Sequence, residues 1–199
     1  MTPTLAEVLA SAELPDSDTA RLDAELLLCH AIGKPRTYLR TWPERRPDAE
    51  QLRRFEQLLS QRRSGVPIAY LLGEQGFWSL QLEVSNRTLI PRPDTERLVE
   101  VALELGPQGA AEVLDLGTGT GAIALALAAE RPDWQLTGVD RVAEAVALAR
   151  RNADAALPTV AELVPTRGAT ALVLGDHDPA LLDLFEHWPA AATTEVARL

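Results

Sequence analysis

The sequence is poor in the residues from which disulfides, metal sites and membrane spans are built. Its 199 residues include one cysteine, Cys29, and three histidines. One cysteine cannot form an internal disulfide, and so few soft ligands exclude a zinc site of the usual spacing. No apolar run approaches the roughly 20 residues that cross a bilayer, and the start, MTPTLAEVLASAELPD, lacks the basic stretch of a signal peptide. We therefore expect a protein of the cytoplasm without a metal or a membrane contact.

Positive charge is scarce as well, and unevenly so. The net charge is −10, and residues 1–75 carry 11 acidic and 10 basic side chains, against 18 and 9 in the remainder. An acidic surface repels phosphate backbones, so we expect no direct binding to nucleic acid. A small molecule or a protein fits better as partner, and we expect a monomer.

The first 73 residues have apolar side chains at helical spacing. The pattern predicts a helix near the N-terminus, a second that is capped by Asp16 or Ser17 and ends near Gly33, and a third after Pro47. The apolar residues that define them are Leu5, Val8 and Leu9; Leu22, Leu26, Leu27 and Cys29; and Leu52, Phe55, Leu58 and Leu59. The third helix also carries two arginine pairs, at 53–54 and 62–63, which form either a solvated face or a docking surface for an acidic protein.

Residues 74–93 differ from the helical region before them. Alternating apolar residues from Trp78 to Val84, with a turn signal at Ser85-Asn86, predict a β-hairpin or short paired strands. Two prolines then stiffen the chain around Arg92. A helix follows, capped by Asp94 or Thr95 and burying Leu98, Val99 and Ala102.

A glycine-rich stretch, VLDLGTGTGAIALALA over residues 113–128, is the most informative part of the chain. It predicts an apolar strand, a loop with Gly117, Gly119 and Gly121 at alternate positions, and a helix. A strand that leads into a helix through such a loop begins a doubly wound α/β domain, which binds ligands at the carboxyl end of that strand. The glycines let the backbone turn sharply and approach a bound molecule closely.

An acid lies about twenty residues beyond these glycines. The segment WQLTGVD, residues 134–140, predicts the next strand, with Asp140 at its end. A carboxylate there can accept hydrogen bonds from both hydroxyls of a ribose. The loop and the acid together indicate a ligand that contains a nucleoside.

The spacing of the loop favours one class of nucleoside cofactor. The dinucleotide fingerprint is G-x-G-x-x-G, whereas here the third glycine comes one position early and Asp115 precedes the first glycine by two residues. No lysine follows, which excludes a GxxxxGK[ST] phosphate loop. The D-x-G-x-G-x-G pattern resembles the first motif of methyltransferases that use S-adenosylmethionine. The alternatives are a nicotinamide site and a loop kept only for its tight turn.

Two longer stretches resemble the protein-glutamine N5-methyltransferases. They are RRSGVPIAYLLGEQGFWSLQLEVSNRTLIPRPDTERLVE and VLDLGTGTGAIALALAAERPDWQLTGVDRVAEAVALARRNA. LIPRPDTE directly before the α/β domain is a hallmark of this family, and the resemblance is strongest to the members that methylate the Gly-Gly-Gln glutamine of peptide chain release factors. It implies an α/β fold with a helical N-terminal domain, residues 1–73, that recognises the release factor, a β-hairpin linker, 74–93, and an incomplete Rossmann-like class I methyltransferase domain, 94–199.

The resemblance also implies roles for individual residues. The loop residues Gly117, Thr118, Gly119, Thr120 and Gly121 would contact the methionine part and the sugar of S-adenosylmethionine, and Asp140 would hold the ribose hydroxyls. Arg92 either shapes the mouth of the site or is purely structural.

The sequence departs from this family after about residue 156. The family's chemistry rests on an Asn-Pro-Pro-Tyr motif, but this sequence has no adjacent prolines, and its two tyrosines lie in the N-terminal region. Asn86 and Asn152 cannot take the part of the motif's asparagine, and neither His177 nor His187 belongs to a catalytic constellation. The tail predicts only strands at 160–164 and 171–174 and a helix at 179–187. We therefore expect a truncated or frame-shifted protein with an open apolar sheet edge.

Several functions remain open at this point. The first is S-adenosylmethionine-dependent glutamine methylation, impaired by the missing motif and without an assignable catalytic residue. The alternatives are a non-catalytic module that binds release factors, a methyltransferase for a ribosomal protein glutamine, and a nicotinamide-dependent oxidoreductase. The acidic charge and LIPRPDTE disfavour a methyltransferase for nucleic-acid adenine.

Overall fold

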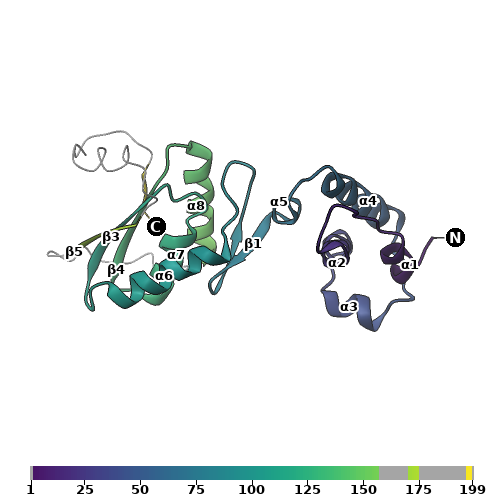
Figure 1. The fold of residues 1–199 in the computed structure, drawn as a ribbon, viewed down its shortest axis with the longest axis horizontal. Helices are drawn as coiled ribbons and strands as arrows, with labels where there is room; N and C mark the ends of the chain where they lie inside the picture. The colour runs from purple at the N-terminus through teal and green to yellow at the C-terminus, as the bar shows by residue number, and fades with distance from the viewer. Residues whose placement is uncertain (1, 157–169, 175–195, 199) are drawn as a thin grey trace. The chain divides into compact units, whose positions relative to one another are not determined.

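The computed structural model describes residues 2–156, 170–174 and 196–198. The chain divides into two compact units, residues 1–73 and 74–199 (Figure 1). Each unit has its own cluster of buried apolar side chains. The units are therefore described one at a time.

The first unit is helical throughout its described elements. They are α1 (Leu5–Ala10), α2 (Ala20–Ile32), α3 (Arg36–Thr41), α4 (Ala49–Arg63) and α5 (Ile68–Leu72). The helices predicted from apolar spacing are α1, α2 and α4, and all of them are confirmed. Their buried faces meet in one core that includes Leu5, Leu27, Leu28 and Phe55.

Local signals explain where these helices begin and end. A capping box between Thr4 and Glu7 starts α1, and another between Asp48 and Gln51 starts α4. Helix α2 ends at Gly33, whose φ of 64° is left-handed. The predicted start of α2 is wrong, because its N-cap is Thr19.

Ser17 has a different role from the cap that the sequence predicts. Its hydroxyl accepts a hydrogen bond from the Thr19 N–H and donates one to the carboxylate of Asp23. Asp23 is buried and also accepts a hydrogen bond of 2.8 Å from the Arg62 Nε. Ser17 therefore supports a buried ion pair in this unit.

The arginine pairs of α4 have partners within the first unit. Arg62 pairs with Asp23, and Arg53 pairs with Glu50 on the same helix. The Arg63 guanidinium donates to a main-chain carbonyl, and Arg54 contacts the ring of His30. These contacts favour a structural role for the pairs over a docking role.

The second unit begins with a β-hairpin. Strand β1 (Glu74–Phe77) runs antiparallel to β2 (Leu80–Glu83). The turn lies at Trp78-Ser79, so Ser85-Asn86 does not close the hairpin. Trp78 adopts a φ of 56°, and Glu96 and Glu130 hold it by accepting from its main-chain and indole N–H groups at 2.8 Å. A bulky residue in a left-handed conformation gives no turn signal in a sequence.

The other described strands form one sheet with the order β5-β3-β4-β6. The elements of this part are α6 (Pro93–Leu105), β3 (Ala111–Leu116), α7 (Ala122–Glu130), β4 (Trp134–Val139), α8 (Ala143–Ala156), β5 (Thr170–Leu174) and β6 (Val196–Arg198). Strand β3 pairs in parallel with β4 on one side and with β5 on the other. The strand order thus reverses at β3, and the carboxyl end of such a strand is where open α/β sheets bind ligands.

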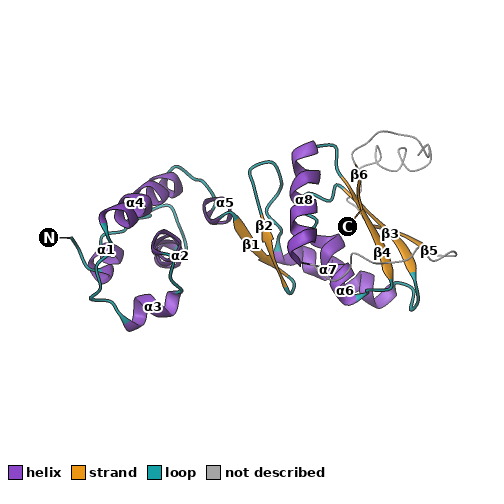
Figure 2. Cartoon of the chain, turned by 180° about the vertical axis from the view of Figure 1, so that it is seen from behind, coloured by secondary structure: helices purple, strands orange, loops and turns teal. Residues whose placement is uncertain are grey.

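Helices α6, α7 and α8 lie on the same side of this sheet, with the hairpin beyond them (Figures 1 and 2). Buried side chains of α6 and α7 share a core with the hairpin, β3 and β4, and Ala153 of α8 packs against it. The largest buried side chain in this core is the indole of Trp134 on β4. The described fold thus combines a helical unit, first along the chain, with an α/β unit that has an incomplete Rossmann-like sheet, as the sequence predicts.

Some predictions for the second unit need correction. Helix α6 has Arg92 as its N-cap and Pro93 in its first turn, instead of a cap at Asp94 or Thr95. Leu98 is exposed, whereas Val99 and Ala102 are buried. The strand expected at 171–174 is confirmed as β5. The elements expected at 160–164 and 179–187 lie outside the described residues.

The outer edge of β4 is paired. Strand β6 runs antiparallel to it over Thr137, Gly138 and Val139. The sequence predicts an open sheet edge without saying which strand forms it, and the pairing with β6 bears only on β4. Among the described residues, no helix has the length and apolar character needed to cross a membrane.

Candidate functional site

The glycine loop closes the carboxyl end of β3 onto the end of β4. The main-chain N–H groups of Gly117 and Thr118 both donate to the Val139 carbonyl at 2.9 Å, and the Gly121 N–H donates to the Thr118 carbonyl at 2.8 Å. Gly117, Gly119 and Gly121 have φ angles of 78°, 54° and 83°. The loop depends on this left-handed backbone at alternate positions, which glycine adopts without strain.

Two glycines are required by their surroundings. A Cβ at Gly121 would lie 3.1 Å from Leu125 Cδ1 and 3.3 Å from the Cβ of Ala149, so the bare backbone lets α7 start close to α8. A Cβ at Gly138 on β4 would lie 2.7 Å from the Thr118 hydroxyl. The loop therefore packs directly on the neighbouring strand.

Asp140 follows β4 directly and faces the loop. Its Oδ2 accepts a hydrogen bond from the Gly119 N–H at 3.0 Å, and its Oδ1 accepts one from the Val142 N–H at 2.9 Å. These bonds fix the orientation of the carboxylate. Each carboxylate oxygen can accept more than one hydrogen bond, so the group keeps acceptor capacity for a ligand.

A second carboxyl lies beneath the loop. Asp115 is 2% exposed, and its Oδ2 accepts from the Thr118 hydroxyl at 2.8 Å. Burial raises the pKa of Asp115 to about 6, and the negative charge of Asp140 adds to the rise. Hydrogen bonds from Thr118 and from the Ala124 N–H oppose it. The site thus combines two carboxyl groups of different surroundings at the ends of adjacent strands.

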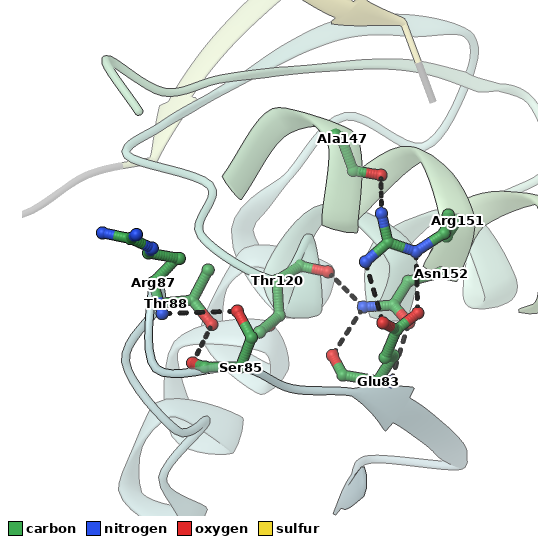
Figure 3. Close-up of polar contacts among 8 residues, drawn as sticks. All are labelled: Glu83, Ser85, Arg87, Thr88, Thr120, Ala147, Arg151 and Asn152. Atoms are coloured by element: carbon green, nitrogen blue, oxygen red, sulfur yellow. Dashed lines mark hydrogen bonds and ion pairs between the residues drawn. The ribbon is translucent and has the colours of Figure 1, made fainter. Parts of the chain in front are cut away.

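Asn152 on α8 connects the loop to the hairpin (Figure 3). Its Oδ1 accepts from the Glu83 N–H at 2.7 Å, and its Nδ2 donates to the Glu83 carbonyl at 3.0 Å and to the Thr120 carbonyl at 2.9 Å. The sequence places this asparagine at a helix end without a role. Its three partners are 32 and 69 residues away along the chain, and no local pattern marks such a contact.

Comparison with known proteins gives two domain matches and several similar proteins. Residues 7–73 match the PrmC N-terminal domain family, and residues 95–177 match the methyltransferase small domain family. The release factor glutamine methyltransferase of Pseudomonas aeruginosa is 62% identical over 149 residues, which are 75% of this chain and 54% of that protein. The protein of the same name from Escherichia coli is 54% identical over 144 residues, or 72% and 52% of the two chains.

Over about three quarters of its length, the chain is thus similar to proteins named release factor glutamine methyltransferase. It spans about half the length of the curated relatives that it matches. The match to the methyltransferase small domain covers the glycine loop and Asp140 and runs to residue 177, so it includes β5. The second unit therefore contains the region that matches a methyltransferase domain.

The remaining residues that the sequence singled out are Arg92 and two histidines. Arg92 is exposed at the start of α6, where its carbonyl accepts from the Thr95 N–H, and the geometry assigns its side chain no role in the site. His177 and His187 lie outside the described residues. Within the described part of the chain, no three side chains of the metal-binding types gather as an ion would require.

Proposed function

We propose that the second unit binds S-adenosylmethionine at the carboxyl end of β3. Gly117 to Gly121 would contact the methionine part and the sugar, and Asp140 would accept hydrogen bonds from the ribose hydroxyls. The observation that carries this proposal is the direct bond between the two parts, from the Gly119 N–H to Asp140 Oδ2. A nucleoside site needs the loop and the acid side by side, and this bond joins them.

The surface of the loop suits this cofactor. Gly117 is exposed and Gly119 is partly exposed, and neither carries a Cβ that would stand between a ligand and the main chain. The match of residues 95–177 to the methyltransferase small domain favours a methyl donor over a nicotinamide.

The chemistry that we propose is methyl transfer to a glutamine amide of a peptide chain release factor. When bound, S-adenosylmethionine supplies a methyl group on a positively charged sulfur. The new bond joins this methyl carbon to the amide nitrogen, the sulfur–carbon bond breaks, and the nitrogen loses a proton. The loop and Asp140 would hold the donor in one orientation, and such positioning can contribute several kcal/mol to the rate.

The amide nitrogen is a poor nucleophile because its lone pair is delocalised into the carbonyl. By the family resemblance, the Asn-Pro-Pro-Tyr motif positions it, and the 199 residues contain no such motif. We therefore propose that this chain binds the cofactor weakly and does not methylate at a detectable rate.

Calorimetry on the purified chain tests the cofactor, with S-adenosylmethionine and NAD titrated in parallel. We expect heat with the first and none with the second, and the reverse would refute the proposal. Incubation with a release factor and labelled cofactor tests the chemistry, where robust labelling would contradict the loss of activity. Reading the coding DNA past codon 152 in all three frames would show whether a shifted frame encodes Asn-Pro-Pro-Tyr.

We also propose that the first unit docks the release factor. The observation that favours this role is that residues 1–73 form a compact unit with a core of their own, which matches the PrmC N-terminal domain. Immobilised full-length chain should retain a release factor from a purified mixture. Retention of a ribosomal protein instead would reassign the substrate, and retention of neither would end the proposal.

A further inference from the structure

One buried side-chain amide joins three elements of the second unit. Asn152 is 3% exposed, and both N–H groups and the oxygen of its amide are used, toward Glu83 on β2 and Thr120 in the glycine loop (Figure 3). Its pairing with both the N–H and the carbonyl of Glu83 imitates the hydrogen bonds of a neighbouring strand. An amide offers two donors and an acceptor in one plane, which neither a hydroxyl nor a carboxylate provides.

Asn152 contacts the carbonyl of the Thr120–Gly121 peptide group, whose rotation is eased by the glycine at position 121. Gly121 follows Thr120 at a φ of 83°, and Gly119 precedes it at 54°. Because glycine is allowed on both sides of the φ map, rotation of this peptide meets less steric resistance than elsewhere. Such a rotation would reverse the directions of the Thr120 carbonyl and the Gly121 N–H.

Both ends of this peptide group are held. The Gly121 N–H donates to the Thr118 carbonyl at 2.8 Å, and the Thr120 carbonyl accepts from Asn152 at 2.9 Å. Thr120 is itself buried, at 3% exposed. Without Asn152 its carbonyl would lose this partner in a place where an unpaired acceptor is costly.

We propose that Asn152 is a positioning residue that holds the Thr120–Gly121 peptide, and with it the glycine loop, in the geometry that receives the cofactor. The effect on affinity rests on the proposed function, whereas the effect on the loop can be measured without any cofactor. Two hydrogen bonds fix the Asn152 amide to the main chain of Glu83 in the hairpin, and the third holds the Thr120 carbonyl of the loop.

The substitution Asn152→Asp tests this role at nearly constant volume. It removes both donors and turns a carboxylate oxygen toward the carbonyls of Glu83 and Thr120. Burial raises the pKa of such a carboxyl, and its protonated form regains one donor. The defect should therefore shrink as the pH falls. The other ionisable groups nearby are Glu83 and Arg151 beside the amide and Asp115 and Asp140 at the loop, and Asn152→Asp leaves all four in place.

The chain offers a matched control next to Asn152. Arg151 donates to the Glu83 carboxylate at 2.9 and 2.8 Å, so it joins the same helix to the same strand. It is exposed and has no hydrogen bond to the loop. Arg151→Gln thus weakens the link between α8 and the hairpin without changing what holds the Thr120 carbonyl.

The first experiment is amide hydrogen exchange of the loop in full-length, cofactor-free protein. We expect Asn152→Asp to speed exchange of the loop amides at pH 7.5 by about tenfold over Arg151→Gln, the factor for one buried hydrogen bond. Equal exchange in the two variants would overturn the proposal. If circular dichroism shows that Asn152→Asp does not fold, Asn152→Ser takes its place in the same comparison.

The second experiment is calorimetry with S-adenosylmethionine on the same proteins. The ratio of the Kd of Asn152→Asp to the Kd of the unmodified chain should be at least about ten at pH 7.5. At pH 5.5 this ratio should fall toward one. The ratio for Arg151→Gln should stay near one at both pH values. An equal, pH-independent loss in both variants would mean a merely structural role. If the unmodified chain does not bind, the proposed function fails, and the exchange comparison still decides the role of Asn152.

Discussion

The buried carboxyl of Asp115 should make the second unit less stable at neutral pH than at acid pH. The perturbation that tests this is Asp115→Asn, which keeps the shape of the side chain and removes its charge. In the folded protein the pKa of Asp115 is raised from 3.8 to about 6, because the side chain is buried and Asp140 is near. The unfolded chain keeps the ordinary value.

The sign and size of the effect follow from this difference. A carboxyl with the higher pKa in the folded state ionises at a cost to the fold. This cost is absent below about pH 4 and complete above the folded pKa. A shift of about two units corresponds to about 3 kcal/mol at pH 7.5, falling to about 1 kcal/mol at pH 4.5. The amide of Asp115→Asn cannot accept every hydrogen bond that the carboxylate accepts. This loss lowers the free energy of unfolding of the variant by about 1 kcal/mol at any pH.

The assay is urea unfolding followed by tryptophan fluorescence, since Trp134 is buried in this unit. Asp115→Asn should raise the free energy of unfolding by about 2 kcal/mol at pH 7.5, and this gain should vanish toward pH 4.5. Glu112→Gln, an exposed position on the same strand, is the control and should change the value by less than about 0.5 kcal/mol. A gain that does not depend on pH, or a loss at pH 7.5, would refute the reasoning.

Three further changes have separable outcomes. Asp140→Ala should weaken S-adenosylmethionine binding about tenfold or more in calorimetry, because the proposed ribose contacts and the bond to the loop would be lost together; an unchanged Kd would remove Asp140 from the site. Gly121→Ala should cost more stability in urea than Gly117→Ala, by about 1 kcal/mol or more, since both have a positive φ but only Gly121 is crowded. Arg62→Met should destabilise the first unit by about 3 kcal/mol in thermal unfolding, because it leaves the buried Asp23 unpaired. Burial alone would raise the pKa of Asp23, but hydrogen bonds from Arg62, Ser17 and Thr19 lower this pKa on balance. The unmodified unit should therefore lose stability as the pH falls below about 4.

The elements that could be predicted from the sequence are those with a periodic pattern. Helices α1, α2 and α4 follow apolar residues at helical spacing, and the strand, loop and helix around the glycines follow an apolar run broken by Gly117 to Gly121. Helices α3 and α5 were not predicted. In α3, RTYLRT, Leu39 is the one buried residue, and α5, IAYLL, consists of apolar and aromatic residues only, so neither segment alternates between an apolar and a polar face.

The missed parts of the second unit depend on contacts between distant residues. The turn at Trp78 is held by Glu96 and Glu130, which lie 18 and 52 residues further along the chain. The hydrogen bonds of Asn152 join a strand, a loop and a helix. Tertiary contacts of this kind override local preference, and a single sequence does not record them.

The place that a Cβ of residue 138 would occupy is taken by the side chain of Thr118 in the glycine loop. Because a Cβ there would lie 2.7 Å from the Thr118 hydroxyl and 3.0 Å from the Thr118 Cβ, the two positions form one steric unit. Evolution can enlarge residue 138 only by shrinking residue 118 in the same lineage. Across related proteins, these two sites should therefore vary together, although twenty residues separate them.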